Sequence, residues 1–157
     1  MKIPQEIRKI TDKLEDSGFE AFVVGGCVRD GLLHKKPNDW DIATNAIPED
    51  VESIFNKTYS NNNFGTVTVL TGSKKEGLKE VEITPYRTEE NYKDGRHPEK
   101  VEWAKTIDED LSRRDFTINA LAYRPAKEKL VDLFKGKEDL EKEIIKAVGN
   151  PRERFDE

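Results

Sequence analysis

The sequence has little cysteine and histidine and no long apolar run, and each shortage excludes a class of protein. The single cysteine, Cys27, rules out an intrachain disulfide, and two distant histidines, His34 and His97, give no zinc-ligand spacing. Any metal is therefore expected to be a hard cation held by carboxylates. No apolar run approaches the roughly 20 residues that span a bilayer, and the start, MKIPQEIRKI, lacks the apolar stretch of a secretory signal. We expect a cytoplasmic protein with no membrane partner.

Basic residues are also in deficit. The 27 Lys and Arg face 32 Asp and Glu, and the net charge of −5 argues against a general electrostatic grip on nucleic acid. Any RNA contact must be local or made by other segments. At 157 residues and 34% hydrophobic, with no repeat or linker, the chain fits one modest core. We expect residues 1–150 to form one domain and residues 151–157 to begin a helix that the chain end cuts short.

The spacing of apolar residues predicts alternating helices and short strands. Apolar residues recur at helical intervals after Pro4, and Gly18 is placed to end that first helix. The polar turn at residues 71–77 predicts a hairpin between two apolar, β-branched runs. The expected helices span residues 4–17, 28–33, 48–55, 110–123 and 137–143, and the expected strands span residues 19–24, 39–43, 64–70, 80–87, 131–134 and 144–148.

Two aspartates are the first candidates for chemistry. On a strand, Asp39 and Asp41 point to the same face while Trp40 points to the other. Two carboxylates that close repel each other unless a cation lies between them, and Mg²⁺ takes its oxygen ligands from one or two carboxylates, water and substrate phosphates. The alternative is that Asp-Trp-Asp lies on a solvated face or caps a turn, and an isolated motif of this kind favours that alternative.

A glycine pair adds independent weight. Gly25 and Gly26 follow an apolar strand and precede a short helix, where backbone N–H groups can approach a phosphate. Arg29 can clamp a triphosphate through its planar guanidinium, although a salt bridge to Asp30 explains it equally well. The order of strand, glycine turn, arginine and paired aspartates favours a phosphate and metal site over an ordinary turn.

Two further sets of residues are ambiguous by themselves. Glu80 and Glu82 share a face of the next strand, and we prefer Glu82 as a third carboxylate, although a charged surface strand is an equal explanation. Arg113 and Arg114 precede apolar positions, and a solvated helix face would normally explain them. Residues 88–100 are too polar for a core and too long for a tight turn, which indicates a loop beside a site.

In their order, these pieces resemble the class II tRNA nucleotidyltransferases (CCA-adding enzymes) and their bacterial poly(A) polymerase relatives. A lone G-G or D-x-D is a weak signal, whereas the ordered set is highly specific. The matching strings are FVVGGCVRDGLL, NDWDIAT, FGTVTVL, VEITPYRTE, YKDGRHPEKVEW and DEDLSRRDFTINALAY, followed by LVDLFKGKEDL.

The resemblance implies an α+β fold, a polymerase-β-like nucleotidyltransferase head with a mixed sheet of about five strands and flanking helices. It implies that Asp39 and Asp41 bind Mg²⁺, with two ions expected. Gly26, in the Gly25 turn, and Arg29 would contact the phosphates of CTP or ATP. Arg114 would also contact the nucleotide, and Asp115 would shape the ribose pocket. The implied reaction is attack of an RNA 3′-hydroxyl on the α-phosphate, with release of pyrophosphate.

The resemblance also limits which activity is expected. Residues 91–103 resemble the family's flexible loop, which favours full CCA addition. Residues 63–67 look like the tRNA enzymes and lack the basic strand of the poly(A) branch, so poly(A) polymerase is the second choice. The base-selecting E-D-x-x-R motif reaches only its first residue at Glu157, and segments beyond this chain are expected to hold the tRNA 3′ end. A non-catalytic nucleotide-binding module is a third hypothesis, and an enzyme that modifies a small molecule or protein is a fourth.

Overall fold

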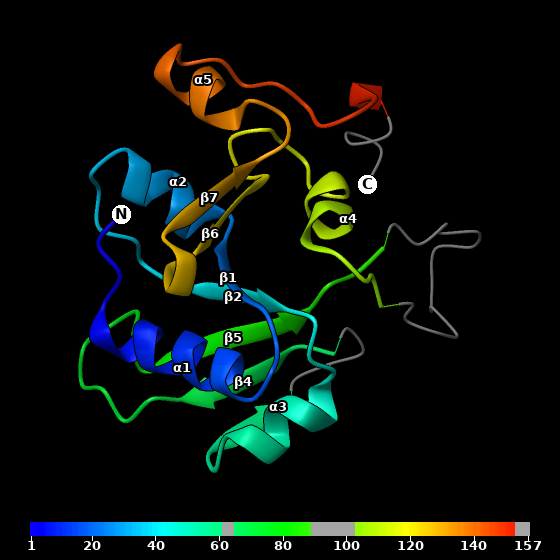
Figure 1. The fold of residues 1–157 in the computed structure, drawn as a ribbon. Coiled ribbons are helices and arrows are strands. Elements are labelled where there is room, and N and C mark those ends of the chain that lie inside the picture. The colour runs from blue at the N-terminus through cyan, green and yellow to red at the C-terminus, as the bar shows by residue number, and fades with distance from the viewer. Residues whose placement is uncertain (61–64, 89–102, 153–157) are drawn as a thin grey trace.

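The computed structural model describes residues 1–60, 65–88 and 103–152, which form a mixed sheet with helices packed on both faces (Figure 1). In this part of the chain the sheet has seven strands in the order β3-β4-β5-β2-β1-β6-β7. Neighbouring strands are antiparallel except β2 and β5, which are parallel. The strands are β1 (Ala21–Val24), β2 (Asp41–Thr44), β3 (Thr58–Ser60), β4 (Val67–Leu70), β5 (Glu80–Pro85), β6 (Leu121–Arg124) and β7 (Lys129–Asp132), and the helices are α1 (Gln5–Asp16), α2 (Gly26–Leu32), α3 (Pro48–Ile54), α4 (Ile107–Ser112), a 3₁₀ turn η1 (Pro125–Lys127) and α5 (Gly136–Glu141).

One face of the sheet carries the larger core. Helix α1 presents Ile7, Ile10 and Leu14 to this core at helical spacing, and they pack with strand residues such as Val23 and Ile83. Burial of these side chains is the main force that holds α1 on the sheet. The helix ends before Gly18, which has a positive φ of 91°, as the sequence predicts. No helix in the described residues is long and apolar enough to cross a membrane.

The opposite face is covered by α4. Leu111 of this helix packs with Phe22, Val24 and Tyr86 in a second, smaller core. The helix begins at a capping box, in which the Thr106 hydroxyl accepts a hydrogen bond from the backbone N–H of Glu109. Because the start of α4 is fixed in this way, its last turn and the arginines that follow lie over the sheet.

The strand register brings the predicted site residues of β2 and β5 to one end of the strands. Val24, the last residue of β1, pairs with Asp41 of β2 and with Ala122 of β6. Asp41 in turn pairs with Glu82 of β5. We call this end of the strands, which lies next to Gly25, the Gly25 edge.

Most expected elements are present, but the sheet has seven strands instead of about five. The hairpin of β4 and β5 is confirmed. The sequence does not predict the three-residue edge strand β3, and β6 overlaps the end of the helix expected at residues 110–123.

The expected helix at residues 110–123 is wrong beyond Ser112. After α4 the chain forms tight turns, because Thr117 is buried and its hydroxyl donates a hydrogen bond to Asp139 at 2.7 Å. The backbone N–H of Thr117 donates to the backbone carbonyl of Lys146 at 2.9 Å. Tertiary hydrogen bonds therefore override helical spacing here, and the chain re-enters the sheet as β6.

The strand expected at residues 144–148 is also wrong. This segment makes an isolated bridge between Phe116 and Ala147. The segment around Phe116 consists of turns, so it cannot pair further with residues 144–148 as a second strand. Ile145 is 74% exposed. Residues 151–152 are helical, but residues 153–157 lie outside the described part of the chain, so the helix expected over residues 151–157 stays a prediction.

Candidate active site

Asp39 and Asp41 open onto the same pocket at the Gly25 edge. Asp41 is the first residue of β2, and Asp39 lies two residues earlier, outside the strand. Both are exposed, whereas Trp40 between them is 5% exposed and belongs to the larger core. The pocket has a volume of about 470 Å³ and is also lined by Thr68, Lys79 and both glutamates of β5. The predicted alternation of the two aspartates and the tryptophan is therefore present.

Glu82 lies beside Asp41. The two residues are register partners in the parallel pair of β2 and β5 and line two adjoining pockets together. Glu80 lines the first pocket but accepts a hydrogen bond from the Tyr59 hydroxyl at 3.1 Å. The structure thus pairs Glu82, the preferred glutamate, directly with Asp41, whereas Glu80 is hydrogen-bonded to Tyr59.

Asp41 is electrostatically unfavourable in its charged form. Its pKa is raised from 3.8 to about 6, first because the surrounding protein desolvates it and then because Asp39 and Glu82 repel its charge. Arg114 acts in the opposite direction and lowers the pKa. A carboxylate in this state gains most from a cation, which would remove the repulsion.

The donor set suits a hard cation. Within the described residues, no three His, Cys, Asp or Glu side chains form a group that could hold a metal ion by themselves. Mg²⁺ does not need such a cage, because it binds through one or two carboxylates and completes its shell with water and substrate phosphates. Asp39 and Asp41 fit that requirement in residue type and placement.

The glycine turn lies directly beside this group. Gly25 has φ 73° and ψ −135°, a conformation that favours glycine, and precedes the first residue of α2. Its N–H donates to the carbonyl of Leu121 at 3.0 Å. A Cβ at Gly25 would lie 3.0 Å from Nη1 of Arg114. The absence of a side chain at Gly25 therefore allows the Arg114 guanidinium to approach the turn.

Arg114 is held from behind by a carboxylate. Its Nη2 donates to Oδ2 of Asp110 at 3.2 Å. Its Nε is buried and has no hydrogen-bond partner among the described residues. A buried, unsatisfied donor of this kind is unfavourable by itself and indicates a place where an acceptor from a ligand would be stabilising.

Arg29 has protein partners in this structure. Its guanidinium pairs with Asp30 at 2.9 Å, so the salt bridge that the sequence allowed is present. Its Nη1 also donates to Oδ1 of Asn119 at 2.7 Å. A Cβ at Gly26 would lie 3.6 Å from Nη2 of Arg29, which places the arginine against the second glycine. A role in phosphate binding stays a prediction.

Asp115 is exposed and belongs to the same neighbourhood. Its Oδ1 accepts hydrogen bonds from the backbone N–H of Phe116 at 2.6 Å and from Nδ2 of Asn119 at 3.4 Å. Asn119 thus links Asp115 to Arg29. The structure brings these predicted nucleotide-binding residues together, and their role in binding ribose stays a prediction.

Sequence reasoning missed Asp110 and Asn119. The sequence places Asp110 only at the start of a helix, although Arg113 and Arg114 follow it by three and four residues, the spacing at which helical side chains meet. That spacing is a usable signal. Asn119 has no such signal, because its contacts with Arg29 and Asp115 depend on turns that the sequence did not predict.

Cys27, beside the glycine turn, is not a nucleophile. Its thiol is buried, and burial raises its pKa to about 12. The Sγ atom donates to the carbonyl of Val24 at 3.1 Å. Because the thiolate is the reactive form, Cys27 serves to pack the turn against the sheet.

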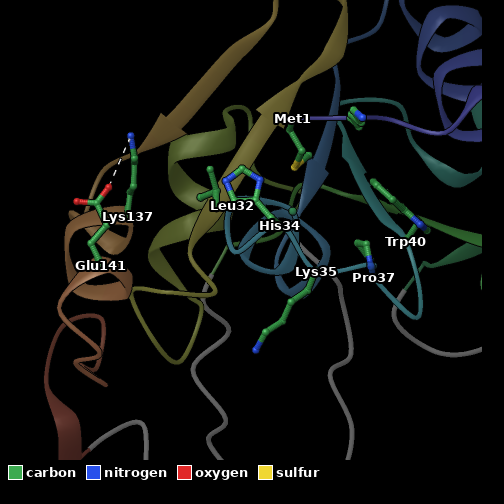
Figure 2. Close-up of a pocket in the computed structure, with 10 residues that line it drawn as sticks. Met1, Leu32, His34, Lys35, Pro37, Trp40, Lys137 and Glu141 are labelled. Atoms are coloured by element: carbon green, nitrogen blue, oxygen red, sulfur yellow. Dashed lines mark ion pairs between the residues drawn. The ribbon is translucent and has the colours of Figure 1, made fainter.

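A larger pocket lies elsewhere and holds none of the predicted site residues. It has a volume of about 790 Å³, and Trp40 lines both this pocket and the carboxylate pocket. Figure 2 shows Lys137 and Glu141 facing each other as an ion pair at one wall. The chemistry-bearing residues therefore gather in the smaller pockets at the Gly25 edge.

Comparisons with known proteins show which family this chain is similar to. Residues 21–146 match the poly A polymerase head domain family. The CCA-adding enzyme of Limosilactobacillus reuteri is 50% identical over 151 residues, which cover 96% of this chain and 36% of that protein. This chain thus spans about a third of the length of that relative.

Solved structures give the same result. The crystal structure of the Bacillus stearothermophilus CCA-adding enzyme in complex with CTP matches with a TM-score of 0.82 and 40% identity, covering 99% of this chain and 36% of that chain. A tRNA nucleotidyltransferase complexed with a primer tRNA and an incoming ATP analog matches with a TM-score of 0.68 and 29% identity, covering 89% and 39%. The resemblance read from the sequence is confirmed, and the chain belongs to the poly A polymerase head domain family.

Proposed function

We propose that this chain is the nucleotide-transferring head of a CCA-adding enzyme. The reaction would transfer CMP and AMP from CTP and ATP to the 3′-hydroxyl of tRNA and release pyrophosphate. The observation that carries the proposal is the meeting of Asp41 and Glu82 at the Gly25 edge, beside Arg114. Further support comes from the relatives that match nearly the whole of this chain, because they are named CCA-adding enzymes.

The carboxylates would hold Mg²⁺, with Asp39 and Asp41 as ligands and two ions expected. When bound, such ions lower the pKa of the attacking hydroxyl and stabilise the leaving oxygens of an in-line displacement. Asp41 in its charged form would help to hold the cation, whose charge would offset the repulsion from Asp39 and Glu82. Glu82 adds negative charge on the same side and is proposed as the third catalytic carboxylate.

The basic and glycine residues would bind the triphosphate. The turn at Gly25 and Gly26 would let phosphate oxygens approach the backbone, and a side chain at Gly25 would crowd the Arg114 guanidinium there. Arg114 would donate its buried Nε to a phosphate oxygen. Arg29 would turn from Asp30 to the phosphates, and Asp115, which is exposed, would accept from a ribose hydroxyl.

The direct test is extension of a tRNA that lacks its 3′ CCA. The full-length protein that contains this chain is incubated with this tRNA, Mg²⁺, CTP and ATP, and the products are resolved at single-nucleotide length. Addition of C, C and A is expected. Incorporation of long runs of A from ATP alone would instead make it a poly(A) polymerase. Nucleotide binding without extension under any condition would favour a non-catalytic module.

The metal assignment is tested by the Asp39→Asn/Asp41→Asn double variant. Loss of extension by at least about a thousandfold is expected, because the two proposed metal ligands are removed. The matched control is Asp12→Asn/Asp16→Asn, which removes two negative charges from exposed positions of α1. Full activity of the first variant would remove both aspartates from the mechanism.

A further inference from the structure

Asp110 is a buried carboxylate at the Gly25 edge that the proposed reaction does not use. It is the fourth residue of the six-residue helix α4 and is 1% exposed. Its Oδ1 accepts from Nε and Nη2 of Arg113 at 3.0 and 2.9 Å, and its Oδ2 accepts from Nη2 of Arg114 at 3.2 Å. The backbone N–H of Arg87 donates to Oδ1 at 3.2 Å. Each of these contacts requires an acceptor, which the two oxygens of the Asp110 carboxyl group supply.

The arginines of this cluster also line a pocket. One carboxylate, Asp110, faces two guanidinium groups, Arg113 and Arg114, whose side chains are 25% and 20% exposed. The adjoining pocket of about 220 Å³ is lined by the three arginines Arg87, Arg113 and Arg114 and by the three carboxylates Asp41, Glu82 and Asp110. Arg114 lowers the pKa of Asp41, so the two charges interact across this pocket. An anion that enters together with a cation would therefore meet the arginines beside the proposed metal ligands.

The geometry of Arg114 depends on Asp110 at one end and on Gly25 at the other. Asp110 holds Nη2, while Nη1 lies 3.0 Å from the place where a Cβ of Gly25 would be. The Arg114 guanidinium is thus held by Asp110 on one side and lies in the space left by the missing side chain of Gly25 on the other. Its Nε has no hydrogen-bond partner among the described residues, so the arginine is oriented but not satisfied.

We propose that Asp110 is a positioning residue for the incoming nucleotide: it orients the Arg114 guanidinium at the Gly25 turn so that Arg114 can bind the triphosphate. Asp110 itself does not contact the nucleotide. This inference rests on the proposed function, because it assumes that the pocket binds a nucleoside triphosphate.

The test is a double-mutant cycle on nucleotide affinity. Asp110→Asn keeps the size of the side chain but presents an NH₂ group to donors that need an acceptor. It is expected to weaken Mg²⁺-dependent binding of CTP and ATP about tenfold, the same loss as Arg114→Gln. The double variant is expected to bind no more weakly than Arg114→Gln alone, because a positioning residue acts only through its partner.

Two further variants keep the test interpretable. Glu15→Gln is the matched control, because Glu15 also holds an arginine, Arg124, but at the opposite end of the sheet. It should lower the melting temperature and leave both dissociation constants within about twofold. If Asp110→Asn does not fold, Asp110→Glu keeps the charge and misplaces the acceptor, and it should also weaken binding only when Arg114 is present.

Inorganic triphosphate separates the two proposals. Coupled loss of CTP, ATP and triphosphate affinity supports the positioning role. Additive effects of Asp110→Asn and Arg114→Gln, or an unchanged affinity in Asp110→Asn beside a weakened Arg114→Gln, would overturn it and leave the proposed function intact. If triphosphate binds with the same coupling while CTP and ATP do not bind, Asp110 orients Arg114 toward a polyphosphate alone, and both the role toward a nucleotide and the proposed function are overturned. Binding of none of the three overturns both.

Discussion

An arginine cluster lies at each end of strands β1 and β6, and the two clusters differ in how completely their hydrogen bonds are satisfied. At the far end, Nε and Nη2 of Arg124 donate to Glu15 at 2.7 and 2.8 Å, and Nη1 donates to Glu20 at 2.6 Å. At the Gly25 edge, Arg114 has Asp110 as a partner and keeps a buried, unsatisfied Nε. One cluster is complete within the protein, and the other leaves a place for a ligand.

The carboxyl groups at the two ends also differ, in the direction of their pKa shifts. Burial would raise the pKa of Glu15, but the hydrogen bonds from Arg124 and from the N–H of Ala21 lower it overall. The pKa of Asp41 is raised to about 6 by desolvation and by repulsion from Asp39. Stabilised charge indicates a structural role, whereas unrelieved charge is typical of functional sites.

Breaking the cluster of Arg124, Glu15 and Glu20 is expected to have the largest effect on the free energy of unfolding. In Glu15→Ala, Arg124, whose side chain is 11% exposed, loses its bidentate partner. The free energy of unfolding is expected to fall by about 3 kcal/mol, the lower part of the range for a broken buried pair. Urea unfolding measures this. Nucleotide affinity of the folded variant should not change, and a marked loss of affinity would contradict the separation of the two ends.

Gly25→Ala tests the incomplete cluster through its backbone. The positive φ of Gly25 and the crowding against Arg114 are expected to lower the free energy of unfolding by about 2 kcal/mol. Binding of CTP and ATP should weaken in parallel, because Arg114 is displaced. Gly72→Ala is the control, since Gly72 has φ 76° and a Cβ there would meet nothing within 4 Å. Equal nucleotide affinity in both variants would remove the glycine turn from the site.

Glu82→Gln distinguishes the two glutamates of β5. A fall of about tenfold in the rate of tRNA extension is expected, because the charge beside Asp41 is removed. Glu80→Gln, which removes the same charge two residues away, should change the rate less than about threefold, since Tyr59 binds Glu80. Quantification of extended tRNA under single-turnover conditions measures both. The reverse order would assign the third carboxylate to Glu80.

The sequence predicted this end of the sheet well because its signals are local. Strand alternation oriented Asp39 and Asp41, and the glycine pair ended a buried strand, so the register of β1 and β2 had few alternatives. The sequence places Glu80 and Glu82 on one face of a strand and supports only a preference for Glu82. The choice depends on the parallel pairing of β2 with β5, which is not encoded in either strand alone.

The region after Ser112 was predicted poorly for the opposite reason. Its conformation depends on distant partners, namely Asp139 for the Thr117 hydroxyl and Lys146 for the Thr117 N–H. Helical spacing of apolar residues is misleading where buried side-chain hydrogen bonds decide the backbone. The contact of Asn119 with Arg29 follows from these turns and was invisible for that reason. The loop expected at residues 91–103 lies outside the described residues except for Trp103.

The smallest expected effect is a gain in stability from Asp41→Asn without metal. In the folded protein Asp41 keeps its proton up to about pH 6, whereas its ordinary pKa is 3.8. Between these values the folded state binds more protons than the unfolded state, so stability falls as pH rises through this window. Above about pH 6 the full cost is present. Asn carries no charge, so the variant is expected to be more stable at pH 7 by about 1 kcal/mol, after discounting for the exposure of Asp41.

Urea unfolding in EDTA at pH 7 and at pH 3.5 measures this difference. At pH 3.5 Asp41 is largely protonated in both states, so the two proteins should have nearly equal stability. An equal gain at both pH values would mean that packing, not charge, explains the effect. Added Mg²⁺ should stabilise the unsubstituted protein more than Asp41→Asn, because a bound cation adds its binding free energy to the folded state. If Asp41 belongs to a metal site, its charge should lower the free energy of unfolding without metal and raise it with metal. The charge of a structural carboxylate such as Glu15 should show neither effect.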